Sequence, residues 1–356
     1  MTAQRIVICL HDLFAGGTER IAIGLAADWI EAGREVAILC GTAEGGLRDS
    51  VDPRVRVVAM QPPVKRGLLS RFRLARAMAK HVAALRPDVI FLPGNFHALL
   101  ANPLRAVDDH PKIVLKISNP PLPAGLPFAD RLFRHFTRGV DGFAAMNAGL
   151  ARQLKVMLPD RNIVTLYDPV YVQPHALRPP REGALNILWI GRLEPQKDPR
   201  LALDVIAAMK EPVKLTMLGV GTLRGELERR ISDQGLNAKV TLAGYVEAIE
   251  PYLADADALL ITSRYEGGPA VAVEALAQGV PVVSTDCSFL LRDLLSIPQA
   301  GKIIASRQAV GLATALAHVC TQPRMPEKLQ SLAAPFAPKA CARAYLDWLD
   351  VLVGHG

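Results

Sequence analysis

Two cations in the second half of the chain have the spacing of a phosphate-binding pair. Arg192 follows Gly191 directly after an apolar run, and Lys197 comes five residues later, at the start of a predicted helix. Arginine is a planar fork of donors and lysine a point charge, so the two together can clamp a pyrophosphate. The residues alone leave open that both cations instead pair with Glu194 and Asp198 on a solvated loop.

Two carboxylates, Glu266 and Glu274, stand at E-x7-E spacing around a glycine-rich turn. Gly267 and Gly268 leave their backbone amides unhindered, and Pro269 suits the first position of a helix, where no N–H is needed. Glu274 lies among apolar residues of that helix, where a carboxylate is costly to bury without a partner. The turn therefore predicts a polar ligand site, with a solvent-facing Glu274 as the alternative.

Two more glycine turns follow apolar runs. Gly16 and Gly17 open a helix, whose first-turn amides favour an anion, although a simple tight turn also fits. Gly219 and Gly221 resemble a truncated dinucleotide fingerprint. That fingerprint requires an acid at the end of the following strand, and none occurs before Glu247, so nicotinamide and flavin cofactors are discounted.

These turns lie between short β-branched runs that alternate with helical patterns. In the first half the predicted strands are 5–10, 36–40, 55–59, 89–92, 113–117, 142–146 and 162–166, with helices at 17–32 and 69–85. In the second half the predicted strands are 186–190, 214–218, 240–243, 258–262 and 280–284, with helices at 198–209, 223–234 and 270–277. Such alternation predicts an α/β fold of two doubly wound parallel sheets covered on both faces. The turns then lie at the carboxyl edges, where such sheets bind ligands, and two facing edges would form a central cleft.

The length of 356 residues also favours two domains. We expect an N-terminal domain at 1–168, a linker at 169–184, a C-terminal domain at 185–338 and a terminal helix at 339–356. The linker is predicted because prolines interrupt any helix or central strand there. These prolines are Pro169, Pro174, Pro179 and Pro180.

Charge and composition narrow the function classes. Residues 1–181 contain 24 Lys and Arg against 15 Asp and Glu, a net charge of +9, whereas residues 182–356 carry a net charge of −2. No apolar run approaches the roughly 20 residues of a transmembrane helix, and residues 1–10 are expected to form a strand instead of a signal peptide. The five cysteines form no CxxC pair, so neither a metal site nor a disulfide framework is expected, and the cytoplasm is the expected compartment.

Residues 64–86 contain seven cations and no acid, with Phe72 among apolar residues at helical spacing. A basic amphipathic helix suits an anionic membrane surface, although a solvated basic face is the ordinary alternative. Nucleic acid is not an expected partner, because aromatic residues are few and no recognition motif occurs. The candidate membrane residues are Lys65, Arg66, Arg71, Arg73, Arg76 and Lys80.

Taken together, the motifs resemble the retaining, nucleotide-sugar-dependent glycosyltransferases of family 4, which have the GT-B fold. The resemblance implies that the terminal helix at 339–356 crosses back to the N-terminal domain. The most specific matches are the Gly-Arg…Lys and E-x7-E motifs, the latter followed by Ala-Leu-Ala-Gln-Gly-Val-Pro-Val-Val. The N-terminal Gly-Gly-Thr-Glu-Arg-Ile matches less specifically. Asp168-Pro169-Val170 stands where that family has Asn-Pro-Val.

The resemblance implies roles for these residues. Arg192 and Lys197 would bind the donor diphosphate and stabilise the leaving nucleotide, and Glu266 would contact the donor sugar. Glu274 would accept hydrogen bonds from the ribose. His97 would be a further catalytic residue near the donor sugar. The remaining donor contacts would come from Gly16, Gly17, Gly191, Gly219, Tyr245, Val246, Gly267, Gly268, Pro269, Ala270 and Val271.

On the acceptor side the resemblance implies Asn95, Ser118 and Asn119, and Asn95 competes with His97 for the catalytic position. The family uses no essential metal. Asp255-Ala256-Asp257 is superficially like the DxD of metal-dependent transferases, but it precedes a strand and is interpreted as structural.

The implied reaction moves a sugar, with retention, from a nucleotide-diphosphate sugar to a hydroxyl group of a lipid-linked or polysaccharide acceptor. The expected donor is a UDP- or GDP-sugar, no cofactor is expected, and the enzyme would attach peripherally to the inner face of the plasma membrane. Two alternatives share the fold: a non-hydrolysing nucleotide-sugar epimerase and a non-catalytic nucleotide-sugar-binding module.

Overall fold

The structure is a computed structural model that describes residues 2–14, 16–67, 70–105, 110–120, 129–172 and 183–354. Internal contacts divide the chain into two compact units, of which unit 1 comprises Met1–Pro169 with Phe336–Gly356 and unit 2 comprises Val170–Pro335. Most of the predicted linker, residues 173–182, lies outside the described residues. Both units are α/β folds with an all-parallel sheet, which confirms the predicted fold class.

Unit 1 contains a seven-stranded sheet in the order β3-β2-β1-β4-β5-β6-β7. All neighbouring strands are parallel; Ile6, for example, stands in register with Val36 on one side and Val89 on the other. The order changes direction between β1 and β4, which is a topological switch point. The strands are β1 (Arg5–Leu10), β2 (Glu35–Cys40), β3 (Arg56–Ala59), β4 (Val89–Leu92), β5 (Lys112–Ile117), β6 (Gly142–Ala145) and β7 (Asn162–Thr165).

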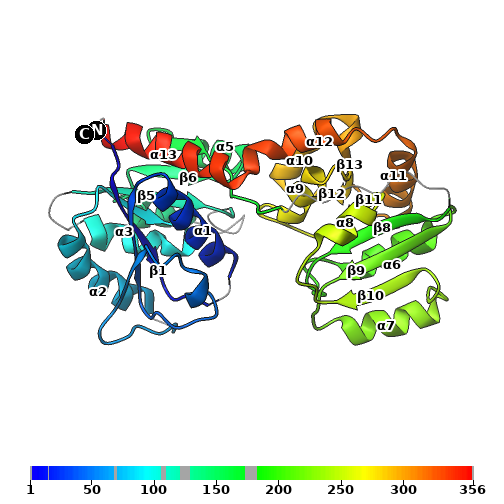
Figure 1. Cartoon of the computed structure of the whole chain (residues 1–356), viewed down its shortest axis with the longest axis horizontal. Helices are drawn as coiled ribbons and strands as arrows, with labels where there is room; N and C mark the ends of the chain where they lie inside the picture. The colour runs from blue at the N-terminus through cyan, green and yellow to red at the C-terminus, as the bar shows by residue number, and fades with distance from the viewer. Residues whose placement is uncertain are drawn as a thin grey trace. The chain divides into compact units, whose positions relative to one another are not determined.

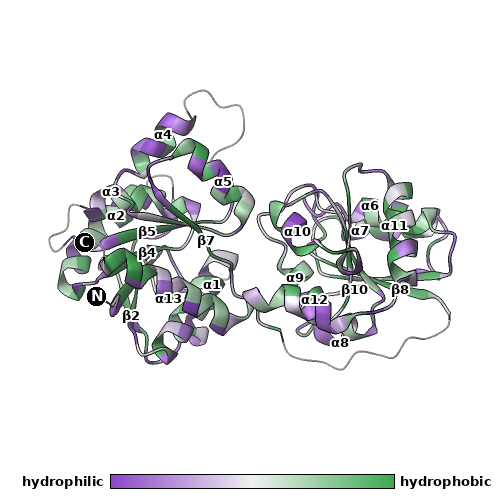
Figure 2. Cartoon of the chain, turned by 90° about the horizontal axis from the view of Figure 1, so that it is seen from above, coloured by the Kyte–Doolittle hydropathy of each residue, from purple (hydrophilic) through white to green (hydrophobic). Residues whose placement is uncertain are grey.

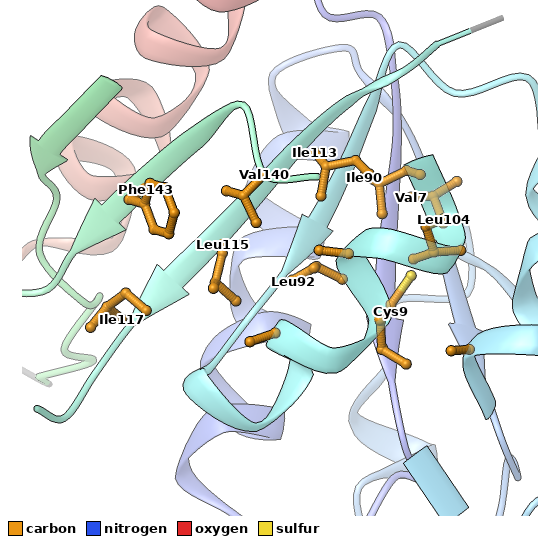
Figure 3. Close-up of a cluster of buried hydrophobic side chains, with 14 of the residues drawn as sticks. Val7, Cys9, Ile90, Leu92, Leu104, Ile113, Leu115, Ile117, Val140 and Phe143 are labelled. Carbon is orange, nitrogen blue, oxygen red and sulfur yellow. The ribbon is translucent and has the colours of Figure 1, made fainter. Parts of the chain in front are cut away.

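Alternate residues of each strand face opposite sides of this sheet. Val7, Ile90 and Ile113 belong to the buried cluster on one side, and Figure 3 shows their side chains on the side where Leu104 lies. Helices from between the strands cover this side, and each contributes apolar residues to the cluster. They are α2 (Ser70–Leu85), α3 (Ala98–Arg105), α4 (Ala129–Phe136) and α5 (Ala148–Met157).

The opposite side of the sheet is covered by the first and the last helix of the chain, α1 (Gly17–Glu31) and α13 (Pro338–Gly354), which lie side by side (Figure 1). Tyr345 of α13 is fully buried, and its ring centroid lies 6.1 Å from that of Trp29 and 5.7 Å from that of Phe91. Trp348 Nε1 donates a hydrogen bond of 3.2 Å to Asn162 Oδ1. The C-terminal helix is therefore part of the core of unit 1.

Unit 2 contains a six-stranded parallel sheet in the order β10-β9-β8-β11-β12-β13. Its strands are β8 (Leu185–Ile190), β9 (Val213–Leu218), β10 (Val240–Gly244), β11 (Ala258–Ile261), β12 (Val282–Thr285) and β13 (Gly301–Ile304). One side packs on α6 (Pro199–Ala208), α7 (Arg224–Asp233) and α11 (Ala309–Thr321) in one buried cluster. The other helices are α8 (Glu250–Asp255), α9 (Ala270–Ala277), α10 (Phe289–Leu294) and α12 (Pro326–Ala333), of which α9 and α12 pack together.

Within the described ranges, none of the helices has both the length and the apolar composition to cross a bilayer.

Candidate active site

The predicted donor residues of unit 2 all follow the carboxyl ends of its strands. Gly191 and Arg192 follow β8, Gly219 follows β9, Tyr245 follows β10, and Glu266 lies in the loop after β11. Because parallel strands end at the same edge, residues far apart in the sequence are brought to one edge of the sheet.

Backbone hydrogen bonds tie three of these loops together. Gly191 N–H donates to Leu218 O at 3.0 Å, and Gly219 N–H donates to Gly244 O at 2.7 Å. Gly219 has a φ of +135°, and a Cβ atom there would lie 1.9 Å from Gly191 O. Only glycine fits this position, because its missing side chain permits both the backbone conformation and the close approach. The loops after β8, β9 and β10 therefore form one scaffold.

The central contact of the site is an ion pair between Lys197 and Glu266, which belong to two different predicted motifs. Lys197 Nζ lies 2.6 Å from Glu266 Oε1, with side-chain exposures of 19% and 9%. Ser263 Oγ donates to the same carboxylate oxygen at 2.6 Å. Glu266 N–H donates to Cys287 O at 2.8 Å, which fixes the backbone at that point. The partly buried pair thus presents a cation and a carboxylate at the edge of the sheet.

Arg192 is exposed next to this pair. Its Nη2 donates to Gln196 Oε1 at 3.2 Å, and Gln196 Nε2 donates to Tyr265 O at 3.1 Å. The alternative in which the two cations pair with Glu194 and Asp198 is wrong, because both acids have other partners. Glu194 accepts from Thr222 N–H at 2.9 Å and from Thr222 Oγ1 at 2.8 Å.

Asp198 supports the site from behind, a role that the sequence analysis missed. It is buried and has a φ of +46°, an uncommon conformation outside glycine. Arg307 Nη2 contacts its carboxylate at 2.6 Å and also donates to Thr262 O at 2.9 Å, while Arg307 Nη1 donates to Ser263 O at 2.9 Å. The residue after Lys197 is thereby fixed to the loop that carries Glu266. Asp198 and Arg307 are 109 residues apart, so no local pattern could pair them.

Glu274, in α9, has a different environment from Glu266. It is half-buried, and within the described ranges its carboxylate has no hydrogen-bond or ion-pair partner. Burial, together with the charge of nearby Glu250, raises the pKa of Glu274 to about 7. An unpaired, half-buried carboxylate is costly, and hydroxyl donors from a ligand would reduce that cost.

The other predicted donor contacts differ in exposure. Tyr245 is 74% exposed, and Val246 beside it is half-buried. Gly267 and Gly268 are half-buried, and Gly267 O accepts a hydrogen bond of 3.1 Å from Ser288 Oγ. Three further residues form the start of α9: Pro269 as the N-cap, followed by Ala270 and Val271.

A pocket of about 400 Å³ opens at the carboxyl edge of the sheet in unit 1, at the switch point between β1 and β4. It is lined by residues from four segments: the β1–α1 loop, the start of α2 with the loop before it, the β4–α3 segment and the end of β5. The charged, aromatic and histidine side chains of the lining are those of His11, Glu19, Arg66, Arg71, Phe96 and His97.

The two histidines of this pocket are buried and carry unpaired ring nitrogens. His97 is 9% exposed and its Nδ1 has no hydrogen-bond partner within the described ranges. His11 Nδ1 lies 3.4 Å from Asp12 Oδ2, and His11 Nε2 has no hydrogen-bond partner among the described residues. Burial lowers the pKa of His97 to about 4, and burial also lowers the pKa of His11. Both imidazoles are therefore neutral at pH 7.

The predicted acceptor residues line the same pocket, and Asn95 organises them. Its Oδ1 accepts from Ser118 N–H at 3.0 Å, and its Nδ2 donates to Asn119 O at 2.8 Å. Asn95 and His97 belong to one short 3-10 helix, Asn95–His97. Asn95 therefore shapes the pocket wall, whereas His97 keeps a free ring nitrogen.

Arg66 was predicted to contact a membrane surface, but in the structure it lines this pocket. Its Nε and Nη2 contact the two oxygens of Asp12 at 2.5 and 3.0 Å, and Nη2 also donates to Glu19 Oε1 at 2.8 Å. Burial alone would raise the pKa of Asp12, but hydrogen bonds from Arg66 and from the Phe14 amide lower it. A Cβ atom on Gly16 would lie 2.3 Å from Glu19 Oε2, so glycine makes room for this carboxylate.

The space beside Gly17 is open: a Cβ atom there would meet nothing within 4 Å among the described residues. The close approach in this turn therefore occurs at Gly16.

The other cations of the basic segment have varied surroundings. Lys65 lies 3.4 Å from Glu44, both exposed, and Arg71 lies over the Phe96 ring at 4.8 Å. Arg73, Arg76 and Lys80 are exposed on α2. The buried side of α2 is formed by Leu74, Ala75, Met78 and Val82, and Phe72 is 50% exposed.

A second basic helix, α4, contains Arg131 and Arg134 and a half-exposed Leu132. Figure 2 shows both hydrophilic and hydrophobic residues along it.

Asp255 and Asp257 lie at the amino ends of the strands, at the edge opposite the site. Asp257 Oδ2 accepts from Asn186 N–H at 2.8 Å and its Oδ1 lies 2.5 Å from Arg324, while Asp255 Oδ2 accepts from Asn186 Nδ2 at 2.9 Å. Both acids hold the start of β8, which agrees with a structural role.

Comparison with known proteins extends these observations. Residues 16–167 match the glycosyl transferase 4-like domain family, and residues 184–322 match the glycosyl transferases group 1 family. The lipopolysaccharide 1,6-galactosyltransferase of Escherichia coli is 22% identical over 261 residues, or 71% of each chain. The same enzyme of Salmonella typhimurium is 27% identical over 163 residues, covering 44% of this chain and 45% of the relative, so the chain matches under half of that relative's length.

Solved structures of similar fold cover nearly all of the chain. The lipopolysaccharide outer core galactosyltransferase WaaB superposes with a TM-score of 0.80 at 18% identity, covering 96% of this chain and 97% of its own. Anabaena Alr3699/HepE, solved in complex with UDP, gives a TM-score of 0.73 at 16% identity, covering 98% and 96%. At these identities the likeness shows the GT-B fold. Since one domain family of such enzymes matches each half of the sequence, the chain belongs to the GT-B glycosyltransferases.

Proposed function

We propose that the chain is a glycosyltransferase that moves a sugar from a UDP- or GDP-sugar to a hydroxyl group of a glycan or lipid-linked acceptor, with retention and without a metal ion. The observation that carries this proposal is the Lys197–Glu266 pair beside Arg192, at the carboxyl edge of unit 2. Cations placed where a diphosphate departs lower the barrier by stabilising the charge that develops on it.

Each residue has a part in this mechanism. Lys197 has three N–H donors, so it can keep its contact with Glu266 while it binds a phosphate oxygen. Arg192, which is exposed, adds a planar fork toward the same diphosphate. Glu266 orients Lys197 and accepts from donor-sugar hydroxyls, and Glu274 accepts from the ribose. Asp198 and Arg307 keep the two loops at the required separation.

The acceptor half of the proposal rests on the pocket in unit 1 and on the relatives. One relative, from Campylobacter jejuni, acts on a diphospho-undecaprenol-linked sugar by its name; it is 33% identical over 118 residues, covering 33% of this chain and 32% of its own. A membrane-borne acceptor suits the exposed cations Arg73, Arg76 and Lys80 on α2. We therefore propose peripheral attachment at the cytosolic face of the membrane.

The central test measures donor binding and turnover. UDP, GDP and their sugars are screened by thermal shift, because a ligand that binds only the folded state raises its melting temperature. Hydrolysis of the donor that binds is then measured without acceptor. We expect Lys197→Met to lower kcat for this hydrolysis by about 10²- to 10³-fold, whereas Lys210→Met, an exposed lysine at the end of α6, leaves it unchanged.

The outcomes separate the alternatives. Stabilisation by none of the nucleotides would contradict the proposal. An epimerase would convert the donor into its epimer, which NMR detects, and a binding module would bind the donor and leave it intact.

Three further measurements test the finer statements. Full activity in EDTA supports a metal-independent reaction, and retention requires the anomeric configuration of the donor in the first-formed product. Sedimentation with anionic and neutral vesicles at two salt concentrations tests the membrane surface. Replacing Arg73, Arg76 and Lys80 together by Gln is expected to abolish binding to anionic vesicles, and equal, negligible binding to both lipids would remove the membrane proposal.

A further inference from the structure

We propose that the pocket of unit 1 binds an acceptor sugar that carries an anionic group, a phosphate or a carboxylate, and that Arg71 selects this group. The inference deepens the proposed function and rests on it, because it names the class of acceptor.

The pocket has the position and size of a small-molecule site. It lies at the switch point of the seven-stranded sheet, where open α/β sheets bind ligands. Its volume of about 400 Å³ lies in the usual range for such sites.

The cations of the pocket are unequal. Arg66 contacts two carboxylates directly, those of Asp12 and Glu19, so its positive charge is more than compensated. Among the described residues, by contrast, no carboxylate lies within ion-pair distance of Arg71. Arg71 is therefore the cation of the pocket that has no carboxylate partner among the described residues.

Arg71 is also held in a defined position. Its guanidinium lies over the Phe96 ring, 4.8 Å from the centroid, and stacking of this kind restricts the rotation of a long side chain. A guanidinium held in this way can donate two parallel hydrogen bonds to a phosphate or carboxylate. Unpaired cations elsewhere on the surface, such as Arg152 on α5, have no such support among the described contacts.

The remainder of the pocket suits an uncharged sugar ring. His11 and His97 line it, and each has a buried ring nitrogen, Nε2 and Nδ1 respectively, without a hydrogen-bond partner among the described residues. Both rings are neutral at pH 7. Hydroxyl groups can donate to such nitrogens or accept from them, which offsets the cost of leaving them unpaired. Phe96, 69% exposed, adds an aromatic surface for the apolar face of a sugar. The two neutral histidines and Phe96 can thus face the ring, Arg66 and Glu19 are paired with each other, and Arg71 remains for a charged substituent.

The test uses the full chain without donor and measures binding instead of turnover. The probes are glucose, galactose and mannose, each free and as its 6-phosphate, together with inorganic phosphate. Binding is followed by NMR of the histidine ring signals, with the His97 signal assigned from His97→Gln. We expect at least one sugar phosphate to shift the His97 signal and to bind at least about tenfold more tightly than both its free sugar and inorganic phosphate.

Variants locate the anion contact. Arg71→Gln is expected to reduce the preference for the sugar phosphate to less than about twofold, and Arg71→Lys, which keeps the charge but loses the planar fork, to leave an intermediate preference. Arg152→Gln removes an exposed cation of the same unit and serves as the control without effect.

Three results would overturn the inference: no binding by any sugar phosphate, equal binding of a sugar and its phosphate, or an unchanged preference in Arg71→Gln. Donor hydrolysis is measured on the same preparation. Hydrolysis without sugar-phosphate binding would refute this inference and leave the proposed function standing, whereas loss of donor binding would refute the proposed function itself.

Discussion

At the scale of single residues, the candidate donor site contains two carboxylates in opposite electrostatic settings. Glu266 contacts Lys197 and accepts from Ser263, so its negative charge is stabilised. Glu274 is half-buried near Glu250, and its pKa is raised to about 7. Glu274 therefore changes its protonation state near neutral pH.

Nucleotide affinity is expected to fall as the pH drops below about 7. In the proposed site the ribose hydroxyls would donate to an ionised Glu274. Protonation would remove that acceptor, so the Kd for UDP or GDP is expected to rise by up to about tenfold per pH unit in this range. Glu250→Gln removes the neighbouring charge and thereby lowers the pKa of Glu274. The loss of nucleotide affinity is then expected at lower pH. Calorimetric titration from pH 5.5 to 8.5 measures the effect.

Glu274→Gln is the control, because the phosphate of the nucleotide also titrates near pH 6. The difference between wild type and this variant isolates the carboxyl. A difference that is flat across the pH range would contradict the assignment of Glu274 to the ribose.

The sequence predicted the residue types of the site but not their partners. The pairing of Lys197 with Glu266 and of Asp198 with Arg307 follows from strand order, because each pair joins loops of different strands. A sequence read locally offers Glu194 and Asp198 as partners for the cations, and both acids bond elsewhere.

At the scale of elements, the strand order of unit 2 brings the loops together and glycine lets them touch. The Gly219 N–H donates a hydrogen bond to Gly244 O, and a Cβ atom at Gly219 would clash with Gly191 O. Gly219 was a predicted ligand contact. In the structure its backbone conformation and its contact with Gly191 already account for the glycine.

Gly219→Ala is expected to destabilise unit 2 by more than about 2 kcal/mol, because it combines a disfavoured φ with a clash against a carbonyl. The matched control is Gly225→Ala in α7, where a Cβ atom meets nothing within 4 Å among the described residues. The Gly225→Ala substitution is expected to stabilise the helix by up to about 1 kcal/mol. Urea unfolding of both variants provides the comparison, and equal stabilities would contradict the account of Gly219.

A second prediction concerns the end of β5. Lys116 is 1% exposed and contacts Asp168 at 2.8 Å, just before the chain leaves unit 1. Lys116→Met leaves the Asp168 carboxylate without its cation and is expected to cost about 3–5 kcal/mol of unfolding free energy. Adding Asp168→Asn should restore much of the lost unfolding free energy, because no unpaired carboxylate then remains. A double variant as unstable as Lys116→Met alone would show that packing of the lysine stem dominates.

Strands were easier to predict than the short elements. The β-branched runs of β1, β2, β8 and β9 are buried and are punctuated by turns, and their predicted bounds agree with the structure to within one residue. Helix α3 has Pro103 inside it, and β13 has four residues and begins at a glycine, so neither had a clear periodicity. In α2 the predicted apolar positions included Phe72, which is half-exposed, because packing on the sheet selects Leu74 and Met78 instead.

At the scale of the whole molecule, unit 1 is made of two separate parts of the sequence. Helix α13 covers one face of its sheet, and besides Trp348 it is tied by Asp350, which accepts from Ala3 N–H at 2.8 Å and contacts Arg34 at 2.8 Å. Residues more than 300 positions apart therefore depend on each other.

Leu349→Ala in α13 is expected to lower the unfolding free energy of unit 1 by about 2–5 kcal/mol, because Leu349 is fully buried against that sheet. Val351→Ala, two residues away and 53% exposed, is the control and should change it by less than about 0.5 kcal/mol. Hydrogen exchange distinguishes the units: faster exchange in β1 and β4 with unchanged exchange in β8 and β9 is expected. Equal acceleration in both units would contradict the division.

The divided unit also sets an order during synthesis. On the ribosome, residues 1–169 emerge first, but the sheet face that carries Phe91 lacks part of its cover until α13 is made, after all of unit 2. Unit 2 is continuous in sequence, so it can complete its fold as soon as its own residues have emerged. The unit that starts first is thus finished last, and its apolar face is the surface of the nascent chain most in need of a chaperone.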